Sequence, residues 1–291
     1  MNSSRVLVTG HTGFVGSALV RRLKEQGNTV VGASASNGCF LETPNALDDI
    51  DGNALSRVYH VAGRTFVPES WEYPHLFYQT NVMGTQTVLD FCRRYGLPLL
   101  YISAYVYGSP SRLPISEEHP HCPDNPYAHS KVLAENLCRF YADKFGVSVT
   151  IARPFNIYGP GQPEQFLLPR IIRQALTENT ITVANTVSRR DFVFIDDVAD
   201  ALVFLAAHQH NSTIYNICSG YSLSVAEVVG AVCETLGKKC SLHSENVYRP
   251  NEVLDVVGSA SNILSLGWKP MYTFTQGLAI TIESLRRGEG K

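Results

Sequence analysis

Residues 5–16 read RVLVTGHTGFVG and form the most informative segment of the chain for its fold. An apolar run, Arg5–Thr9, is followed by three glycines, Gly10, Gly13 and Gly16, and then by an amphipathic segment. In a strand-turn-helix unit, the first glycine permits the tight turn and the second lets a pyrophosphate approach the backbone. The third glycine lets the helix pack closely on the strand. Because this turn lies between a predicted strand and a predicted helix, it indicates a dinucleotide-binding unit.

Strand-like and helix-like segments continue to alternate through the first half of the chain. Apolar runs at 29–33, 57–62, 97–103 and 148–153 predict strands, and the segments 81–95 and 127–145 predict helices. Strands spaced by helices of this length predict an α/β fold with a Rossmann-type, doubly wound parallel sheet. The interval 34–56 is short and irregular, so we expect one strand-helix unit to be trimmed there.

The pattern loosens after Arg153, where proline and glycine cluster in RPFNIYGPGQPEQ. We therefore expect a smaller C-terminal substrate-binding lobe beside the Rossmann domain. The predicted Rossmann domain comprises residues 1–155 and 190–218, with Phe192–Ala207 returning to the main sheet. The predicted substrate lobe comprises residues 156–189 and 219–291.

Composition narrows the classes of partner and compartment. The chain has 291 residues and a formal net charge of -2, and it shows no Lys/Arg cluster that could follow a nucleic-acid backbone, so no nucleic-acid partner is expected. The 7 cysteines are odd in number and form no C-x-x-C pair, which predicts free thiols in a reducing compartment and no metal site. No apolar stretch approaches the ~20 residues of a membrane span, and no leader pattern precedes the first strand. We therefore expect a cytoplasmic protein without a membrane partner.

Tyr127 and Lys131 carry the chemistry. They lie four residues apart in PYAHSKVLAEN, so a helix would place both side chains on one face. A phenol has a pKa near 10, and a nearby cation would lower the pKa of Tyr127 and make proton transfer possible. Ser103 lies 24 residues before Tyr127, in the segment LLYISAYVYG. Together with the opening turn, the three residues predict an oxidoreductase site.

A set of ordered motifs carries a family resemblance across nearly the whole chain. They are TGHTGFVG, YHVAG, TNVMGT, ISAYVYG, PYAHSK, RPFNIYGPGQ, RRDFVFIDDVADAL, YNICSG and RPNEV. The chain resembles the extended short-chain dehydrogenase/reductase family, which contains nucleotide-sugar epimerases, dehydratases and keto-reductases. The resemblance implies a catalytic set of Ser103, Tyr127 and Lys131, supported by Asn81. It also implies that Lys131 hydrogen-bonds the nicotinamide ribose and that Tyr127 exchanges a proton with the sugar oxygen. The family's dimers imply a homodimer built by the helices that carry Asn81 and Tyr127.

One departure from the family pattern separates the possible reactions. The dehydratases that the chain resembles carry a Thr-Asp-Glu run before VYG, whereas this chain has Ser103, Ala104 and Tyr105 there. Without those carboxyl groups, sugar dehydration is not expected. The remaining motifs most resemble deoxysugar-biosynthesis enzymes that reduce a GDP-4-keto-6-deoxy-hexose. Two alternatives stay open: a nucleotide-sugar 4-epimerase of the UDP-glucose type with bound NAD, and a non-catalytic dinucleotide sensor on the same fold.

The end of the second predicted strand bears on the cofactor. NAD-binding folds place an acidic residue there, whereas this chain has Ser34, followed by Ser36 and Asn37. An uncharged pocket tolerates a 2′-phosphate, so NADP(H) is favoured and NAD remains possible. The predicted cofactor-binding residues are Gly10, Thr12, Gly13, Phe14, Val15, Gly16, Ser34, Ala62, Gly63, Tyr127, Lys131 and Pro154.

The predicted partner is a nucleoside-diphosphate sugar. Arg190 and Arg249 match family positions that bind the nucleotide phosphates, and the planar guanidinium of arginine suits bidentate phosphate contact. Asn156 and Asn216 match positions that contact the sugar nucleotide. With Ser103, these four residues form the predicted substrate-binding set.

Overall fold

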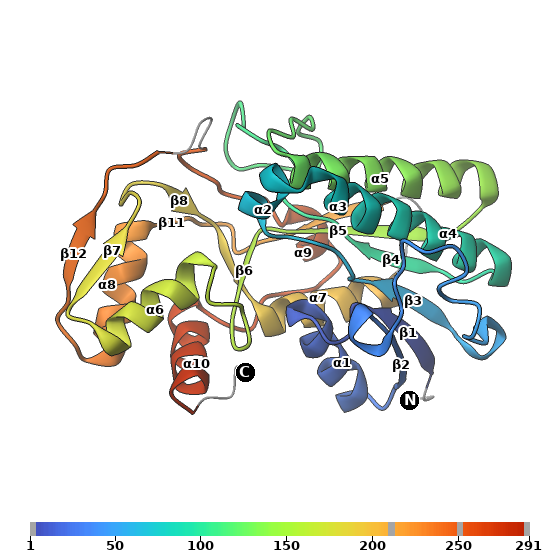
Figure 1. The fold of residues 1–291 in the computed structure, drawn as a ribbon, viewed down its shortest axis with the longest axis horizontal. Coiled ribbons are helices and arrows are strands. Elements are labelled where there is room, and N and C mark those ends of the chain that lie inside the picture. Colours follow the sequence, from blue (N-terminus) through green and yellow to red (C-terminus); the bar gives the residue numbers. More distant parts are fainter. Residues whose placement is uncertain (1–3, 209–212, 249–252, 288–291) are drawn as a thin grey trace. The chain divides into compact units, whose positions relative to one another are not determined.

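The computed structural model describes residues 4–208, 213–248 and 253–287 (Figure 1). The chain divides into two compact units. The first unit comprises residues 1–108, 120–154 and 199–216, and the second unit comprises residues 109–119, 155–198 and 217–291.

A six-stranded sheet forms the centre of the first unit. Its strands lie in the order β10-β5-β4-β3-β1-β2, and the pairings from β2 through β5 are all parallel. The strands are β1 (Arg5–Thr9), β2 (Thr29–Ala33), β3 (Arg57–His60), β4 (Leu99–Ile102), β5 (Val149–Pro154) and β10 (Thr213–Ile217). The strand order reverses at β1, which confirms the predicted doubly wound α/β fold.

Helices cover both faces of this sheet (Figure 1). They are α1 (Phe14–Glu25), α2 (Val67–Glu72), α3 (Pro74–Tyr78), the π-helical η3 (Gln79–Met83), α4 (Gly84–Tyr95) and α5 (Pro126–Phe145). The interval expected to be trimmed holds only two short 3-10 turns, η1 (Ala35–Asn37) and η2 (Gly52–Ala54). Apolar residues of β1, β3 and β4, including Leu7, Val58 and Leu99, are buried in one core with Val88 of α4 and Ala134 of α5. This packing fixes α5 against the strands whose ends carry the candidate site.

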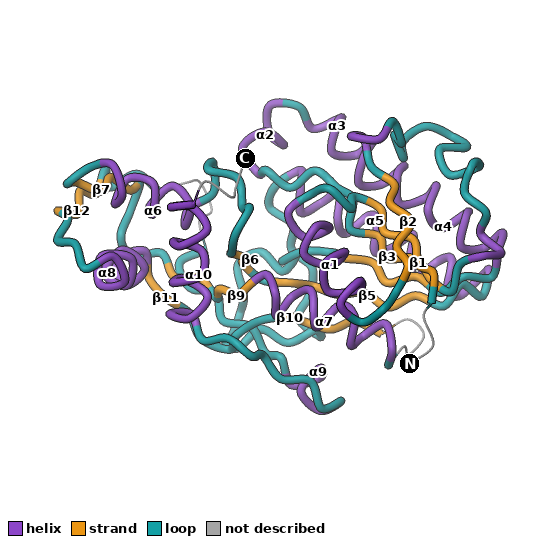
Figure 2. The backbone as a smooth tube through the Cα atoms, turned by 90° about the horizontal axis from the view of Figure 1, so that it is seen from below, coloured by secondary structure: helices purple, strands orange, loops and turns teal. Residues whose placement is uncertain are grey.

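The second unit combines two-stranded sheets with helices (Figure 2). They are β6 (Asn156–Tyr158), α6 (Leu167–Thr177), β7 (Thr180–Val183), β8 (Arg189–Arg190), β9 (Phe192–Phe194), β11 (Leu223–Ser224), α8 (Val225–Leu236), β12 (Ser241–Ser244), α9 (Ser261–Ser265) and α10 (Phe274–Arg287). The buried carboxylate of Asp191 ties its loops together, because it accepts hydrogen bonds from the backbone amides of Ser219, Gly220 and Gly258.

The predicted domain boundaries need two corrections. Residues 109–119 and 190–198 belong to the second unit, because Ile115 bridges to Gly258 and β9 pairs with β6. The prediction that Phe192–Ala207 returns to the main sheet is also wrong. This segment forms β9 and then α7 (Ile195–Ala207), and β10 is the strand that joins the sheet beside β5.

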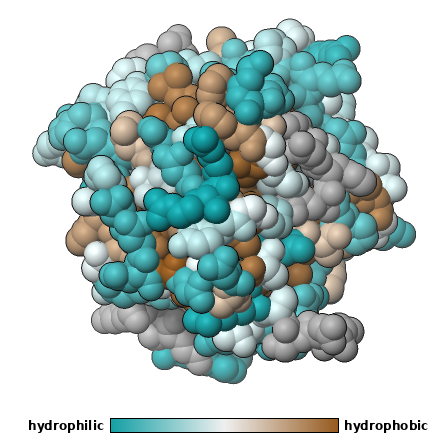
Figure 3. Space-filling model, turned by 90° about the vertical axis from the view of Figure 1, so that its right-hand side faces the viewer, coloured by the Kyte–Doolittle hydropathy of each residue, from teal (hydrophilic) through white to brown (hydrophobic). Residues whose placement is uncertain are grey.

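The surface, the helices and the cysteines each add one observation. On the face drawn in Figure 3, hydrophobic residues occur in small groups among hydrophilic ones. Within the described ranges, no helix is both long enough and apolar enough to cross a membrane. All seven cysteines are free thiols.

Candidate active site

The turn between β1 and α1 has no space for side chains at two of its glycines. Gly10 has a φ of +69°, and a Cβ there would lie 2.6 Å from the Cα of Ala62. A Cβ on Gly16 would overlap the carbonyl oxygen of Gly10. The turn is therefore closed tightly against the end of β3 and against α1, as a dinucleotide-binding turn requires.

The N-terminus of α1 is open to a ligand. Gly13 is the N-cap and is exposed, and no side chain caps the free backbone amides of the first turn, where Phe14 and Val15 lie. Uncapped amides at a helix N-terminus bind anionic groups because their N–H dipoles point outward. The residues present therefore fit the pyrophosphate of a dinucleotide cofactor.

Three hydroxyl groups meet at the end of β2. The Thr12 hydroxyl lies 3.3 Å from that of Ser34 and 2.9 Å from that of Ser36, and the two serine hydroxyls lie 2.8 Å apart. Asn37 completes the turn, because its side chain accepts a hydrogen bond from the Ser34 amide and donates one to the Gly32 carbonyl. No carboxylate takes part in this hydroxyl cluster. An uncharged polar cluster at this position accommodates a 2′-phosphate that an acidic residue would repel.

The predicted catalytic residues lie at the carboxyl edge of the sheet. Asn125 caps α5 by accepting a hydrogen bond from the Ala128 amide, which fixes the turn that carries Tyr127. One turn later, the Lys131 ammonium donates a 2.6 Å hydrogen bond to the carbonyl oxygen of Ile102. This contact joins α5 to the residue directly before Ser103. The predicted cofactor residue Pro154 ends β5 at the same edge.

Ser103 can form a hydrogen bond with a bound ligand through its hydroxyl. Its backbone amide donates to the Ala152 carbonyl at 2.7 Å, so the residue continues the alignment of β4 with β5. Its hydroxyl is buried and has no partner at ordinary hydrogen-bond geometry within the described residues, although it lies close enough to the Glu135 carboxylate to lower the pKa of that group. A buried hydroxyl without a partner carries a desolvation cost that a bound acceptor or donor would relieve.

Burial changes the acid-base properties of Tyr127 and Lys131. Burial raises the pKa of Tyr127, and the prediction that Lys131 lowers it is wrong for this structure. Burial also lowers the pKa of Lys131 to about 8, against the opposing effect of the Glu135 carboxylate. The Lys131 ammonium makes its contacts with Ile102 and, at 4.5 Å from the ring centre, with Tyr101. The phenol of Tyr127 therefore stays protonated at neutral pH.

Asn81 anchors the backbone around the site. It lies in the π-helical turn η3. Its side chain accepts a hydrogen bond from the backbone amide of Arg64 and donates one to the backbone carbonyl of Arg64. It also donates to the Ser130 hydroxyl at 2.9 Å, and that hydroxyl donates to the Tyr127 carbonyl. A Cβ on Gly63 would lie 3.0 Å from the Asn81 side-chain oxygen. Asn81 thus links the turn after β3 to the first turn of α5.

The predicted substrate residues are distributed between the two units. Arg190 and Asn156 lie in the second unit, where Arg190 donates to the Val253 carbonyl and Asn156 donates to the Asp191 carbonyl. Arg249 lies outside the described residues. Asn216 lies in the first unit, fully buried, and accepts a 2.6 Å hydrogen bond from Tyr107. Its contact with the sugar nucleotide stays a prediction.

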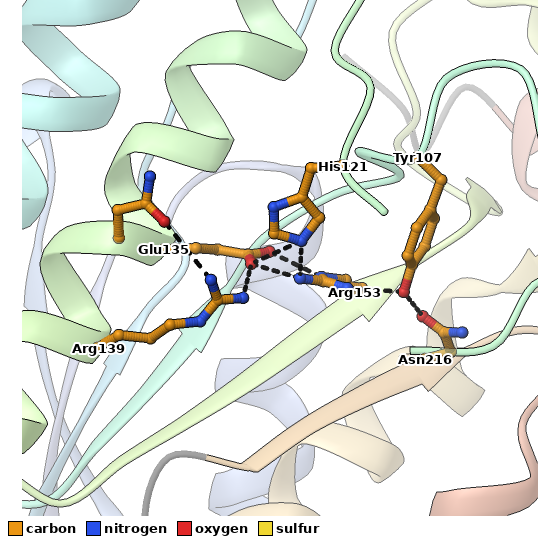
Figure 4. Close-up of polar contacts among 7 residues, drawn as sticks. Tyr107, His121, Glu135, Arg139, Arg153 and Asn216 are labelled. Atoms are coloured by element: carbon orange, nitrogen blue, oxygen red, sulfur yellow. Dashed lines mark hydrogen bonds and ion pairs between the residues drawn. The ribbon is translucent and has the colours of Figure 1, made fainter. Parts of the chain in front are cut away.

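A buried ion pair, Glu135 with Arg153, was missed by sequence reasoning (Figure 4). His121 and Tyr107 both contact Arg153. The sequence did hold one signal, because Glu135 follows Tyr127 by eight residues and Lys131 by four. All three therefore lie on one face of a helix.

Comparison with known proteins agrees with this fold. Residues 6–218 match the NAD dependent epimerase/dehydratase family. The chain is 33% identical over 289 residues to GDP-6-deoxy-D-mannose reductase of Pseudomonas aeruginosa, covering 95% of each chain. It is 30% identical over 312 residues to UDP-glucose 4-epimerase of Mycolicibacterium smegmatis, covering 97% of this chain and 98% of the relative. The solved structure of RMD from Pseudomonas aeruginosa complexed with NADPH superposes with a TM-score of 0.91 at 32% identity, over 98% of this chain and 100% of that one. The chain therefore belongs to the NAD dependent epimerase/dehydratase family, the extended short-chain dehydrogenase/reductases, and is an NAD(P)-dependent enzyme of that family.

Proposed function

We propose that the protein is an NADPH-dependent reductase that converts a GDP-linked 4-keto-6-deoxy-hexose to the 6-deoxy sugar. The hydroxyl cluster of Thr12, Ser34 and Ser36 carries the proposal, because it favours a cofactor with a 2′-phosphate. An enzyme that consumes NADPH carries out a net reduction. The similarity to GDP-6-deoxy-D-mannose reductase and to a structure complexed with NADPH supports the same conclusion.

Each of the predicted catalytic residues has a separate role in this reaction. When bound, NADPH supplies the hydride that reduces the sugar C4 carbonyl. Tyr127, whose phenol is protonated at neutral pH, donates that proton to the carbonyl oxygen. The buried hydroxyl of Ser103 hydrogen-bonds the same oxygen. Lys131 holds the nicotinamide ribose, and Asn81 keeps the backbone of these residues in place.

The residues at positions 104 and 105 argue against dehydration. Ala104 is buried and apolar, and the Tyr105 hydroxyl donates to the Gly108 carbonyl. Neither residue supplies the acid or the base that removal of water from a sugar needs. This observation favours reduction over the dehydratase activity found elsewhere in the family.

The substrate lobe and its diphosphate contacts remain part of the proposal. We assign cofactor binding to the first unit and nucleotide-sugar binding to the second. Arg190, Arg249 and Asn156 are the proposed contacts with the nucleoside diphosphate and sugar, since guanidinium groups bind phosphate oxygens bidentately. The corresponding test is calorimetric titration of GDP into the cofactor-loaded protein. We expect Arg190→Ala to weaken binding by about tenfold or more, and unchanged GDP affinity would remove Arg190 from the site.

Net turnover of cofactor separates the reductase from a 4-epimerase. An epimerase would use Ser103, Tyr127 and Lys131 with bound NAD, and it would oxidise and then re-reduce the sugar without consuming cofactor. The deciding experiment incubates the protein with a panel of nucleoside-diphosphate 4-keto-6-deoxy sugars and NADPH while absorbance of the reduced cofactor is recorded. Consumption in proportion to added sugar supports the reductase. Interconversion of UDP-glucose and UDP-galactose without consumption would support the epimerase instead.

A homodimer also belongs to the proposal, with α4 and α5 as the contacting helices. Exposed apolar side chains support this arrangement, because Met83 directly before α4 is 49% exposed and Phe140 on α5 is 51% exposed. Light scattering after size-exclusion chromatography should give twice the chain mass of 32.1 kDa. A single chain mass at micromolar concentration would contradict the dimer.

A further inference from the structure

One face of α5 carries three functional groups in succession. Tyr127, Lys131 and Glu135 are spaced by four residues, so their side chains project in the same direction along the helix. Lys131 is 4% exposed and Glu135 is fully buried. A carboxylate therefore lies one turn from the proposed catalytic lysine, in an environment from which water is excluded.

Arg153 of β5 holds the Glu135 carboxylate with two hydrogen bonds (Figure 4). Its Nε donates to Oε1 at 2.8 Å, and its Nη2 donates to Oε2 at 2.5 Å. Burial raises the pKa of Glu135, but the hydrogen bonds and the charge of Arg153 outweigh burial and hold that pKa below its ordinary value. Glu135 is therefore ionised at neutral pH, and its position is fixed by a planar partner on the neighbouring strand.

The guanidinium of Arg153 is itself fixed from two further sides. Its Nη1 donates to the Tyr107 hydroxyl at 2.8 Å, and that hydroxyl donates to Asn216. Its Nη2 lies 2.5 Å from His121 Nε2, which accepts because an arginine can only donate. Burial lowers the pKa of His121, and the charge of Arg153 lowers it further, so His121 stays neutral. Residues from the β4–α5 loop and from β10 thus brace the ion pair.

Titratable and charged groups from several elements surround Lys131 and Glu135. Glu135 faces Lys131, Cys138 and Arg139 on α5, Arg153 on β5, His121 in the preceding loop and the Ser103 hydroxyl after β4. Lys131 faces the Tyr101 ring on β4 and His60 on β3. Burial lowers the pKa of His60 to about 3, so this imidazole is neutral. Glu135 is consequently the carboxylate that opposes the loss of the Lys131 proton.

A buried ion pair is weak evidence for stability, because well-packed apolar residues of similar volume often replace such pairs without loss. The location of this pair indicates a different use. We propose that Glu135 is a positioning residue of the active site: Arg153 holds its carboxylate in place, and this carboxylate keeps Lys131 charged for its contact with the cofactor ribose. The inference rests on the proposed role of Lys131, but the effect of Glu135 on that ammonium can be measured without cofactor or substrate.

The primary experiment titrates the Lys131 ammonium by NMR. The protein is labelled with 15N-lysine, the Nζ signals are followed between pH 6 and 11, and Lys131→Arg identifies the signal of interest. The test variants replace the ion pair by groups of similar shape, Glu135→Gln/Arg153→Met and Glu135→Leu/Arg153→Met. We expect the Lys131 midpoint, near pH 8 in the unmodified protein, to fall by about one pH unit in both variants.

Matched variants separate this electrostatic role from a merely structural one. Glu135→Asp keeps a carboxylate and should leave the midpoint within a few tenths of a unit, by the same charge argument. Asp48→Asn/Arg94→Met removes an exposed ion pair of the same unit, joined at 2.7 Å, and should leave the midpoint unchanged. Circular dichroism reports folding for every variant. A folded pair variant with an unmoved midpoint overturns the inference. The inference is also overturned if the Lys131 midpoint falls as far in Glu135→Asp as it does in the pair variants.

NADPH affinity measures how the charge of Lys131 affects cofactor binding. We expect NADPH to bind the pair variants several-fold more weakly at pH 8 than the unmodified protein and about equally at pH 6. If Lys131→Met binds NADPH normally at every pH, the proposed contact of Lys131 with the ribose fails. A displaced Lys131 midpoint would still establish the coupling to Glu135. The two failures are therefore distinguishable.

Discussion

Arg153 and Glu135 face each other with both side chains fully buried, and parallel hydrogen bonds of 2.8 and 2.5 Å join them. Removing one partner of such a pair leaves an uncompensated charge in the protein interior. That loss costs far more than the pair contributes when both partners are present. The relationship therefore makes the two residues strongly dependent on each other.

A single replacement should reveal this dependence. We expect Glu135→Leu to lower the free energy of unfolding by about 3–5 kcal/mol, because Arg153 then remains charged and buried. The double variant Glu135→Leu/Arg153→Met should recover most of the loss. Urea unfolding of the three proteins, with Asp48→Ala as an exposed control, measures the difference. Equal stability of the single and double variants would contradict the predicted cost of leaving Arg153 charged and buried.

Tyr127→Phe tests the proton donor. We expect turnover to fall by roughly 10² or more, since the phenol proton is lost while the ring and its edge contact with Phe77 remain. The affinity for NADPH should stay within about twofold, because the ring shape is kept. Steady-state kinetics and cofactor titration on the purified variant give both values. Turnover near that of the unmodified enzyme would exclude Tyr127 as the acid.

The sequence alone supported most of the first unit. The glycines of the β1–α1 turn, the alternation of strands and helices, and the spacing of Tyr127 and Lys131 are local patterns, and local patterns follow from chain geometry. The helix carrying Tyr127 was predicted over 127–145 and spans Pro126–Phe145 in the structure. The roles of the individual catalytic residues remain proposals.

The features that sequence reasoning missed depend on contacts between distant residues. Arg153 meets Glu135 across 18 positions of sequence, and Tyr107 meets Asn216 across 109. Charge state depends equally on tertiary burial. The expected lowering of the Tyr127 pKa did not occur, because burial of the phenol raises that pKa. The strand β9 was placed in the wrong sheet because three apolar residues fit either sheet equally well.

Lys131 should set the alkaline limit of activity. Its pKa of about 8 lies below the usual value of 10.5, so the ammonium is present at lower pH and is lost as pH rises through 8. We expect kcat/KM to be level at pH 6–7 and to fall above pH 8. In Lys131→Arg the fall should disappear, because a guanidinium stays charged throughout this range, although the overall rate is lower. An unchanged alkaline limb in Lys131→Arg would assign the limit to another group.

Gly16→Ala should disrupt the cofactor-binding turn. Its Cβ would overlap the Gly10 carbonyl, so either the turn or α1 must shift. We expect a loss of about 1–3 kcal/mol in stability and a marked weakening of NADPH binding. Gly230→Ala in α8 is the matched control, because no atom lies within 4 Å of its Cβ position. The control should be neutral or stabilising by up to about 1 kcal/mol. Thermal unfolding and cofactor titration of both variants measure the contrast, and a Gly16→Ala protein as stable as the control would refute the tight packing.

Ser34→Asp tests cofactor choice at the hydroxyl cluster. Ser34 is 7% exposed and exchanges contacts with Thr12 and Ser36, so a carboxylate there would lie where a 2′-phosphate is proposed to bind. We expect the unmodified protein to bind NADPH at least as tightly as NADH. The variant should reverse that preference, because its carboxylate repels the phosphate and accepts hydrogen bonds from the ribose hydroxyls of NADH. The side chain introduced by Ser34→Asn has nearly the same size as that introduced by Ser34→Asp but carries no charge. It should therefore weaken the binding of both cofactors without reversing the order of their affinities. Fluorescence titration of each of the three proteins with each of the two cofactors gives the six affinities to be compared. A strong preference for NADH in the unmodified protein would contradict the NADPH assignment and favour the epimerase, which retains NAD through its catalytic cycle.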